Sequence, residues 1–388
     1  DGDVYLEDLS KMSHEEKYDC AIIGGGVAGL AVAILLAQEN KNVILFEKEN
    51  YPFNKVCGEY ISNESVKFIN NLGVDLSSYE LPKIDSLFMS SISGVSIKRN
   101  LSIGGVGFSR YNLDNLLWQS AIECGVEVKT KTKVQKVEFA DDCFQISLNN
   151  QTISAKTVCG AYGKNSNIDV QLDRTIRAND KHLFIAVKHH IKLPFYDRTQ
   201  VEMHNFRGGY CGLSAIEDDK VNMSYISKAE NLRKCDNKIS ELERQILSEN
   251  PFLRKIIAEA KYELEKPLVI SHLHFGIKTA VDSHILMLGD AAGNIAPLSG
   301  NGISMALRSA TIAHKTISEF LAQKISRMQM ESNYTSEYRH AFSARIRYAR
   351  MIHHTFGKPF LNDLSFYFLK KFPFLVDYTQ AKIHGKEF

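Results

Sequence analysis

Three glycines that follow a short apolar run are the first residues of this sequence whose spacing could serve chemistry. The segment GGGVAG sets Gly24, Gly26 and Gly29 in a G-x-G-x-x-G pattern. In such a pattern the first glycine permits a tight turn, the second lets a pyrophosphate approach the backbone, and the third allows close helix–strand packing. Glu47 ends the next apolar run, where a carboxylate accepts hydrogen bonds from a ribose diol. The pattern predicts a dinucleotide site and does not distinguish NAD from FAD.

A second glycine-rich segment, MLGDAAGNIAPLSGNGISMAL, begins where another apolar run ends. Gly289 and Asp290 follow that run, so the carboxylate of Asp290 can accept hydrogen bonds from a polyol chain at a strand carboxyl end. The turn Gly300-Asn301-Gly302 and Ile303 then open a predicted helix. The N–H groups and partial positive charge of a helix N-terminus suit the pyrimidine edge of a reduced, anionic flavin ring.

The stretch NKVCGEYISN carries Lys55, Cys57, Gly58 and Glu59 close together. A nucleophilic or redox role for Cys57 would need a base partner, and none is evident in the sequence. The stretch is better interpreted as a loop beside a cofactor. Gly58 then permits close backbone approach, and Lys55 neutralises phosphate or ring charge. Cys57 and Glu59 are the candidate catalytic residues, for proton delivery or substrate orientation.

The elements around these motifs indicate a dinucleotide fold that a second sheet interrupts. A strand over 20–23, a helix over 28–38 and a strand over 42–47 form half of a parallel βαβ unit. Other predicted elements are short alternating strands over 81–103, 139–160, 181–228 and 268–277, and helices over 113–124, 237–261 and 301–322. We therefore expect an α/β protein with an inserted antiparallel sheet and a mainly helical segment over 331–388.

Together, GGGVAG…FEK, the Arg in SRYNLDNLL and GDAAGNIAPLSGNGISMAL resemble the FAD-dependent aromatic-hydroxylase superfamily. Its branches are the group A flavoprotein monooxygenases, the geranylgeranyl reductases and the flavin halogenases, and KVCGEYIS and PLSGNGISMAL are most similar to the geranylgeranyl-reductase side. The resemblance implies an extended FAD between a Rossmann-like ββα domain and an antiparallel substrate domain. The positions that it implies for FAD binding are Val27 and Ala28 in the glycine turn, Glu47 and Lys48 at the adenosine ribose, Arg110 at the phosphates or ribityl chain, Val134 at the adenine, Asp290 at the ribityl chain, and Asn301–Ile303 at the ring edge.

The resemblance also implies a discontinuous domain organisation. The predicted parts are a flexible tail over 1–17, an FAD-binding domain over 18–80, 101–165 and 278–330, a substrate-binding β-sheet domain over 81–100 and 166–277, and a C-terminal helical segment over 331–388.

One position departs from the family pattern. The middle motif usually reads Ala-Asp-Gly, whereas GAYGKNS places Tyr162 at the aspartate position. That aspartate is linked with FAD and NAD(P)H binding in the hydroxylases, so direct use of NAD(P)H as electron donor is in doubt. A reductase partner is the alternative source of electrons, and the expected protein partners are such a reductase or a carrier protein. A non-catalytic or electron-transfer flavoprotein is a third interpretation, and Tyr162 could equally be a packing residue.

Two reactions fit the motifs: hydride transfer to a C=C bond, or monooxygenation in a pocket kept dry. Halogenation is disfavoured, because that branch carries a tryptophan-rich motif and this sequence has only Trp118. The expected substrate is a small apolar molecule of lipid-like, isoprenoid, polyketide or aromatic type. Tyr210, in the segment FRGGYCGL, is the candidate substrate contact.

Composition limits the remaining choices. A formal net charge of +2 gives no field that attracts nucleic acid, so we expect no nucleic-acid partner. The seven cysteines are scattered without a C-x-x-C, which favours a reducing, cytoplasmic location. We expect no metal. The aromatic and lysine-rich segment over 353–378 favours helices packed on the core, with peripheral membrane contact as the alternative.

Overall fold

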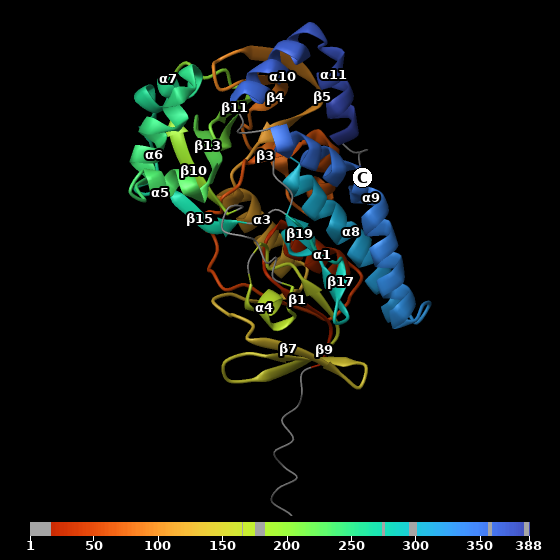
Figure 1. Ribbon diagram of the computed structural model, residues 1–388. Helices are drawn as coiled ribbons and strands as arrows, with labels where there is room; N and C mark the ends of the chain where they lie inside the picture. Colours follow the sequence, from red (N-terminus) through yellow and green to blue (C-terminus); the bar gives the residue numbers. More distant parts are fainter. Residues whose placement is uncertain are drawn as a thin grey trace, which may run out of the picture.

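The computed structural model describes residues 17–164, 166–174, 183–273, 276–294, 301–355, 359–383 and 388. Two sheets and the helices around them make up this part of the chain (Figure 1). The sheet that contains the N-terminal strand lies in the lower half of Figure 1, and the other lies above it. The predicted fold class, an α/β dinucleotide fold with an inserted antiparallel sheet and C-terminal helices, is confirmed.

The first sheet carries the glycine motif. Its strands are β1 (Lys17–Ile23), β2 (Val43–Phe46), β6 (Glu127–Lys129), β7 (Lys136–Ala140), β8 (Cys143–Ser147), β9 (Thr152–Gly160), β17 (Val281–Asp282) and β18 (Ile285–Met287). They follow the order β17-β18-β9-β1-β2-β6, with β8 beside β9 and β7 beside β8. The central strand β1 is parallel to both β2 and β9. Parallel strands with both faces covered need uninterrupted apolar runs, and residues 20–23 of β1 and all of β2 are such runs.

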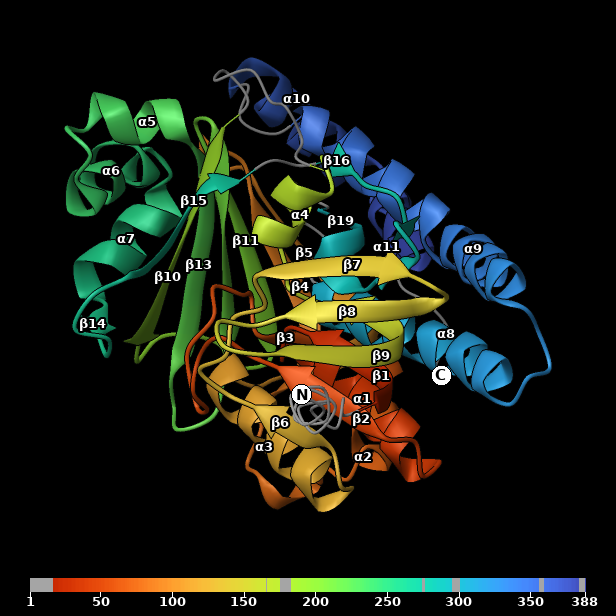
Figure 2. The same cartoon turned by 90° about the horizontal axis from the view of Figure 1, so that it is seen from below.

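The longer helices of this half of the molecule are α1 (Val27–Gln38), α3 (Arg110–Glu123), α8 (Gly302–Leu321) and α9 (Arg327–Thr355). α1 contacts both α3 and α8, and α9 packs on α8. Figure 2 shows α1 and α3 on the side of β1 and β2 that lies away from β7 and β8. The two segments with glycine motifs, which open α1 and α8, are thereby brought together.

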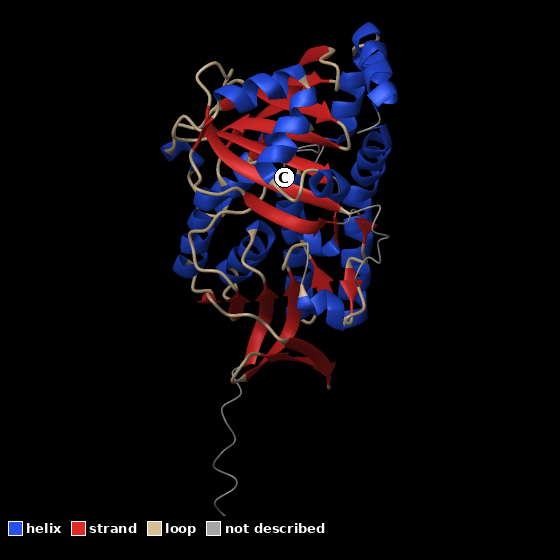
Figure 3. Cartoon of the chain, turned by 60° about the vertical axis from the view of Figure 1, so that its left-hand side comes forward, coloured by secondary structure: helices blue, strands red, loops and turns tan. Residues whose placement is uncertain are grey.

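The second sheet has nine strands: β3 (Tyr60–Ser62), β4 (Lys83–Ser90), β5 (Ser96–Gly107), β10 (Phe184–Lys192), β11 (Gln200–Phe206), β12 (Gly209–Ala215), β13 (Val221–Lys228), β14 (Lys261–Tyr262) and β15 (Leu268–Leu273). The order is β14-β10-β13-β12-β11-β4-β5-β3, with β15 also on β10, and only the β4–β11 pair is parallel. In Figure 3 its strands lie above those of the first sheet. The helices α5 (Ala229–Lys234), α6 (Ile239–Gln245) and α7 (Pro251–Glu259) pack on one face through an apolar cluster that includes Leu242 and Leu253.

Two details differ from the predicted division into domains. The boundary between residues 100 and 101 falls within β5, so one continuous strand joins the two predicted parts. The short helix α4 (Asn167–Gln171), expected in the substrate domain, lies on the first sheet, where Gln171 donates to the carbonyl of Val137 in β7. Of the predicted tail, Lys17 begins β1, and the rest lies outside the described residues.

The remaining described helices and short strands complete the chain. They are α2 (Val66–Asn71), β16 (Gly276–Ile277), β19 (Gly293–Asn294), α10 (Pro359–Lys371) and α11 (Phe374–Ile383). α10 and α11 both contact β5 at the top of Figure 1. They pack there because Phe366 and Val376 are buried against Met89 and Ile97 of the second sheet.

Candidate functional site

A cavity of about 1580 Å³ runs between the two sheets. Its wall includes the glycine turn after β1, the end of β2, the loop over 53–59, the inner face of the second sheet and parts of α10 and α11. Clefts that hold one drug-sized ligand measure roughly 300–1000 Å³. The cavity can therefore hold an extended cofactor together with part of a second molecule.

The glycine turn has the shape that its sequence predicts. Gly24 has a φ of +106°, and a Cβ there would lie 2.5 Å from the carbonyl oxygen of Ala161. A Cβ on Gly29 would lie 2.0 Å from the carbonyl oxygen of Gly24. Both positions therefore require glycine for close packing of α1 against the sheet. Val27 and Ala28 form the first turn of α1 and are buried at the cavity wall.

Gly26 opens towards two cations. A Cβ at this position would lie 3.5 Å from Lys55 Nζ and 3.7 Å from an Arg110 guanidinium nitrogen. Asp114 holds both cations in place: Arg110 donates to its two oxygens at 2.6 and 2.8 Å, and Lys55 Nζ lies 3.1 Å away. Burial alone would raise the pKa of Asp114. The positive charges of Arg110 and Lys55 outweigh that effect, so the pKa of Asp114 lies below its usual value. Cations, a helix N-terminus and an open backbone form a site for a phosphate.

Glu47 lies buried at the end of β2, on the same wall. Its two oxygens accept from the backbone N–H groups of Gly25 and Glu49 at 2.9 and 3.0 Å. Each oxygen keeps a second lone pair, so the carboxylate can still accept from a diol. Lys48 is exposed at the cavity edge. Val134 also lines the cavity, and its carbonyl accepts from Asn167.

The second glycine segment forms another part of the wall. Gly289 has a φ of +54°, and its N–H donates to Ser309 of α8. Asp290 is half-exposed, with Lys164 Nζ 3.9 Å away. Gly302 begins α8 and has no atom within 4 Å of an added Cβ, while Asn301 and Ile303 on either side are buried. The predicted residue Gly300 lies outside the described residues.

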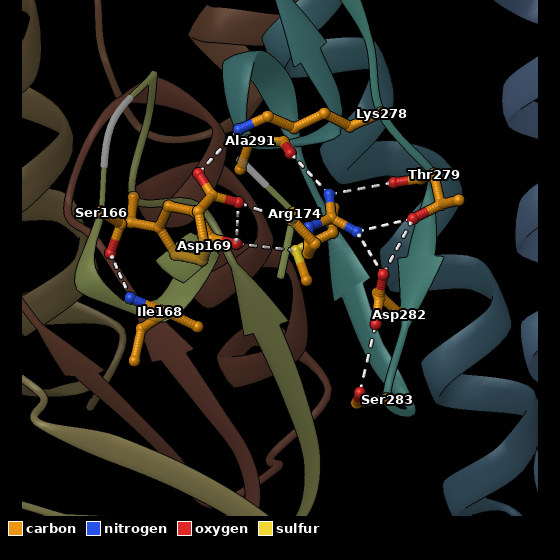
Figure 4. A network of polar contacts seen from close by, with 11 residues as sticks. Ser166, Ile168, Asp169, Arg174, Lys278, Thr279, Asp282, Ser283 and Ala291 are labelled. Atoms are coloured by element: carbon orange, nitrogen blue, oxygen red, sulfur yellow. Dashed lines mark hydrogen bonds and ion pairs between the residues drawn. The ribbon is translucent and has the colours of Figure 1, made fainter. Parts of the chain in front are cut away.

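A buried polar network holds the second glycine segment to α4 (Figure 4). Arg174 donates to the carbonyl oxygens of Ala291 and Thr279 and pairs with Asp169 and Asp282. Lys278 donates to the other oxygen of Asp169 at 2.7 Å. Because Ala291 directly follows Asp290, this network fixes the turn that carries Asp290.

Tyr162, at the position of the family aspartate, belongs to the same network. Its hydroxyl donates to Asp169 at 3.1 Å and lies 3.3 Å from Met287 Sδ. Burial, followed by the charge of Asp169, raises the pKa of Tyr162 above its usual range. Its ring also touches the cavity. The side chain is a neutral packing residue here, and its hydroxyl is already engaged.

Glu59 is a structural carboxylate, and the expected role in proton delivery does not fit its surroundings. It is fully buried, and its oxygens pair with Lys188 Nζ at 2.5 Å and His190 Nε2 at 2.7 Å. The backbone N–H of Arg110 donates to it as well, at 2.7 Å. Burial alone would raise the pKa of Glu59. The interactions with Lys188 and His190 outweigh that effect, so the pKa of Glu59 lies below its usual value. A carboxylate without a proton at neutral pH cannot donate one.

The triad of Glu59, Lys188 and His190 joins the loop over 53–59 to β10. Lys188 and His190 alternate with His189, which binds Glu243 on the opposite, helix-covered face. This arrangement follows the strand period of two, by which neighbouring side chains of a strand point to opposite faces. Lys188 Nζ also donates to the carbonyl oxygen of Lys55. The triad therefore fixes the loop that supplies Lys55 and Cys57 to the cavity.

Cys57 and Tyr210, the predicted catalytic and substrate-contacting residues, both line the cavity. Cys57 is half-buried in the wall, accepts from the N–H of Glu59 at 3.5 Å and lies within hydrogen-bonding reach of Arg110. Tyr210 is buried in the wall on β12, and burial raises the pKa of its hydroxyl well above the usual value. Cys57 thus lies beside Arg110 of the cation pair, and Tyr210 belongs to the second sheet.

On the second sheet and on α10 and α11 the cavity wall is mainly apolar, with Glu202, Ser224 and Gln380 among its polar residues. Residues of β4, β11, β12, β13 and β15 line it. Examples are Leu87, Met89, Met203, Leu213, Ile226 and Ile270. Phe366, Leu369 and Val376 from α10 and α11 close the other side. This apolar compartment suits a hydrocarbon chain or ring.

Three residues that hold the site in place, Asp114, Lys188 and Arg174, were not predicted from the sequence. Asp114 lies one helical turn after Arg110, and that spacing could have identified the pair. No local signal marks Lys188 as the partner of Glu59, because 129 positions separate them. The same holds for Arg174, which reaches Ala291 across 117 positions.

Two buried carboxylates with lowered pKa values, Glu59 and Asp114, should make the stability of the fold depend on acid pH. Glu59 and Asp114 have folded-state pKa values below their ordinary values of 4.5 and 3.8. Their contribution is therefore complete above about pH 4.5 and is lost as the pH falls through the lower folded-state values. We expect the urea midpoint to fall steeply below about pH 4. A Glu59→Gln chain should show a shallower fall, and identical profiles for the two chains would contradict the prediction.

These residues fit an extended flavin dinucleotide. The open cradle at Gly26 with its two cations suits the pyrophosphate, Glu47 the ribose, and Asp290 a polyol chain. The N-terminus of α8 at Gly302 leaves backbone N–H groups accessible to a ring edge. The apolar compartment then lies next to the ring position.

Comparison with known proteins agrees with this geometry. A family model described as an FAD binding domain matches residues 17–347. Conditioned medium factor receptor 1 of Dictyostelium discoideum is 25% identical, over 96% of this chain and 74% of that protein. Digeranylgeranylglycerophospholipid reductase of Methanococcus vannielii is 23% identical, over 84% and 82%. The solved structure of the flavin-dependent brominase Bmp2 matches with a TM-score of 0.77 at 19% identity, over 95% and 93%. At that identity the structural match shows a shared fold.

Proposed function

Since this chain belongs to the FAD binding domain family, we propose that it uses FAD to reduce a C=C bond in a long apolar molecule of the isoprenoid or lipid class. The chain is an FAD-dependent oxidoreductase of the monooxygenase and geranylgeranyl reductase superfamily. What remains to be assigned is the substrate class, the reaction and the source of electrons.

The continuity of the cavity carries the proposal. One space reaches from the cation pair at Gly26 to the apolar compartment beneath α10 and α11. An elongated hydrocarbon can lie in that compartment with one end at the ring position. The similarity to an archaeal reductase whose name specifies a geranylgeranyl lipid, across most of both chains, supports the same substrate class.

The chain binds and orients, and the cofactor supplies the redox chemistry. Bound FAD supplies two-electron transfer. Lys55 and Arg110 hold its phosphates, Asp290 accepts from its polyol chain, and the triad of Glu59, Lys188 and His190 keeps the loop over 53–59 against it. The apolar wall excludes water from the reacting carbon atoms.

Cys57 is the proton donor in this proposal. Reduction of a C=C bond adds one proton to the second carbon, and the donor must lie at the junction of cofactor and substrate. Cys57 lies there, and Glu59 is excluded because it is ionised and fully paired. Tyr210, a polar residue of the cavity wall on β12, orients the substrate.

Oxygenation of the same molecules is the second candidate function. A dry apolar compartment beside the ring serves oxygen chemistry equally well.

The electron donor is also proposed: a reductase partner or carrier protein, in preference to NAD(P)H. The support is Tyr162, whose hydroxyl is engaged with Asp169 where the family has an aspartate.

Turnover without oxygen tests the proposal. FAD-loaded enzyme is reduced with dithionite under nitrogen and offered geranylgeraniol or its fully saturated analogue as control. We expect a product that has gained two hydrogens from the alkene, and at least about tenfold slower turnover for Cys57→Ala with an unchanged flavin spectrum. NADH and NADPH should reduce the flavin far more slowly than dithionite. Product formation only in air, with an added oxygen atom, would establish the second candidate, and no product under either condition would leave a flavoprotein without turnover on this class.

A further inference from the structure

The outer surface of α10 and α11 carries an unusual concentration of large apolar side chains. Six of them are between 47 and 61% exposed. They are Leu361, Leu364, Tyr367, Phe368, Phe374 and Tyr378, and we call them the α10–α11 patch. Exposed large hydrophobic residues elsewhere in the described chain, such as Ile122 on α3 and Met328 on α9, are scattered over other elements. Such a concentration of exposed apolar side chains on two consecutive helices marks an interaction surface.

These helices are already packed on the protein by their other side. Phe366 and Val376 are buried against the second sheet, and Asn362 accepts from the N–H of Ile92. The patch is thus a second apolar face on helices whose first apolar face is already buried against the second sheet. A helix that is apolar on nearly all sides is normally covered on all sides, so the patch fits a further apolar partner.

Charge indicates the kind of partner. Lys370 and Lys371 are exposed in the last turn of α10. The described acids of the two helices are engaged, Asp363 by Ser93 and Asp377 by Arg99. The surface therefore presents aromatic and leucine side chains beside available cations. This combination suits the interface of an anionic bilayer, where apolar groups enter the acyl boundary and lysines remain among the headgroups.

The patch is also continuous with the cavity. Phe368 and Tyr378 belong to the patch and line the cavity as well, next to Leu369 and Thr379. An apolar molecule that leaves a bilayer at this surface would meet the apolar compartment without crossing water. In the described part of the chain, no helix is long and apolar enough to cross a membrane, so contact at this surface would be peripheral.

We propose that the α10–α11 patch docks on the surface of an anionic lipid bilayer and places the cavity mouth at the acyl boundary. The docking surface goes beyond the proposed reaction, because binding needs neither electrons nor substrate. If the reaction test fails, the docking proposal is unaffected. If the docking test fails, the proposed reaction is unaffected.

Flotation of the oxidised, FAD-loaded full chain with vesicles tests the proposal. The vesicles contain either phosphatidylcholine alone or an equal mixture with phosphatidylserine. The patch variant is Leu364→Ser/Tyr367→Ser/Phe374→Ser, which leaves the cavity residues unchanged. The charge variant is Lys370→Glu/Lys371→Glu. The control is Ile122→Ser/Met328→Ser, at apolar positions on other helices that are 48 and 78% exposed.

We expect the native chain and the control to float with the mixed vesicles and to bind phosphatidylcholine more weakly. The patch variant should lose at least about tenfold in binding, and the charge variant should lose the preference for the mixed vesicles. Equal flotation of native and patch variant would overturn the proposal. A native chain that binds neither kind of vesicle would overturn it too. In that case, a native dimer that becomes monomeric in the patch variant, as measured by size-exclusion chromatography, would assign the patch to self-association instead.

Discussion

A Gly26→Asp chain should fold normally and lose FAD. Gly26 is the N-cap of α1, with φ −84° and ψ −177°, and aspartate is a favoured residue in this conformation and position. The helix is therefore not weakened. The new carboxylate, however, lies where a Cβ already comes within 3.5 Å of Lys55 Nζ and 3.7 Å of Arg110, so it takes the cations that a pyrophosphate needs and repels the phosphates.

The expected loss is large. Two like charges about 4 Å apart interact by about 4 kcal/mol at an effective dielectric constant near 20, which corresponds to roughly a thousandfold in affinity. We expect the Kd for FAD, measured by quenching of flavin fluorescence, to rise at least about a hundredfold. Gly26→Asn is the matched control, because it has the same shape and capping ability without the charge, and it should lose much less. Equal Kd values for the Asp and Asn chains would show that no anion binds at this turn.

A Glu59→Gln chain should be strongly destabilised. The substitution keeps the shape of the side chain but removes the countercharge of Lys188, which is fully buried. Removal of one partner from a buried ion pair typically costs about 3–5 kcal/mol. We expect the free energy of unfolding, measured with urea by circular dichroism, to fall by about that amount. FAD affinity should fall too, because the loop over 53–59 loses its attachment to β10.

Two further chains separate this explanation from general fragility. Glu230→Gln removes an exposed partner of Lys234 and should leave the free energy of unfolding nearly unchanged, because solvent screens an exposed pair. Glu59→Gln/Lys188→Met removes the buried charge as well and should recover part of the loss. A cost below about 1 kcal/mol for Glu59→Gln alone would contradict the role of the triad.

The parts of the fold that depend on local pattern could be predicted from sequence. The turn at Gly24, the helix after it and the strand before Glu47 follow one another within one short segment, and hydrophobic period and glycine spacing specify them directly. The second sheet was predicted from alternation in the same way. The end of α8 that carries Gly302 and the turn that carries Asp290 were also predicted from their own residues.

Contacts between distant segments could not be predicted in this way. The sequence shows a carboxylate at Glu59 next to a loop glycine, which suggested a proton donor, and only the fold reveals that Lys188 and His190 keep it ionised. Tyr162 was visible as a departure from a family pattern, but its engagement with Asp169 needs the position of α4. For the aromatic and lysine-rich segment over 353–378, the sequence left two interpretations open: packing on the core or contact with a membrane. The structure shows a buried side and an exposed side on the same two helices, α10 and α11.

The most direct measurement of the central claim is an anaerobic single turnover in a stopped-flow instrument. Enzyme whose FAD has been reduced is mixed with an isoprenoid alkene in the absence of oxygen, and flavin absorbance and product are followed together. The account predicts that the flavin is reoxidised by the alkene, with one C=C bond reduced for each FAD and no reoxidation by the saturated analogue. A flavin that stays reduced with every apolar alkene, and is reoxidised only by oxygen, would contradict it.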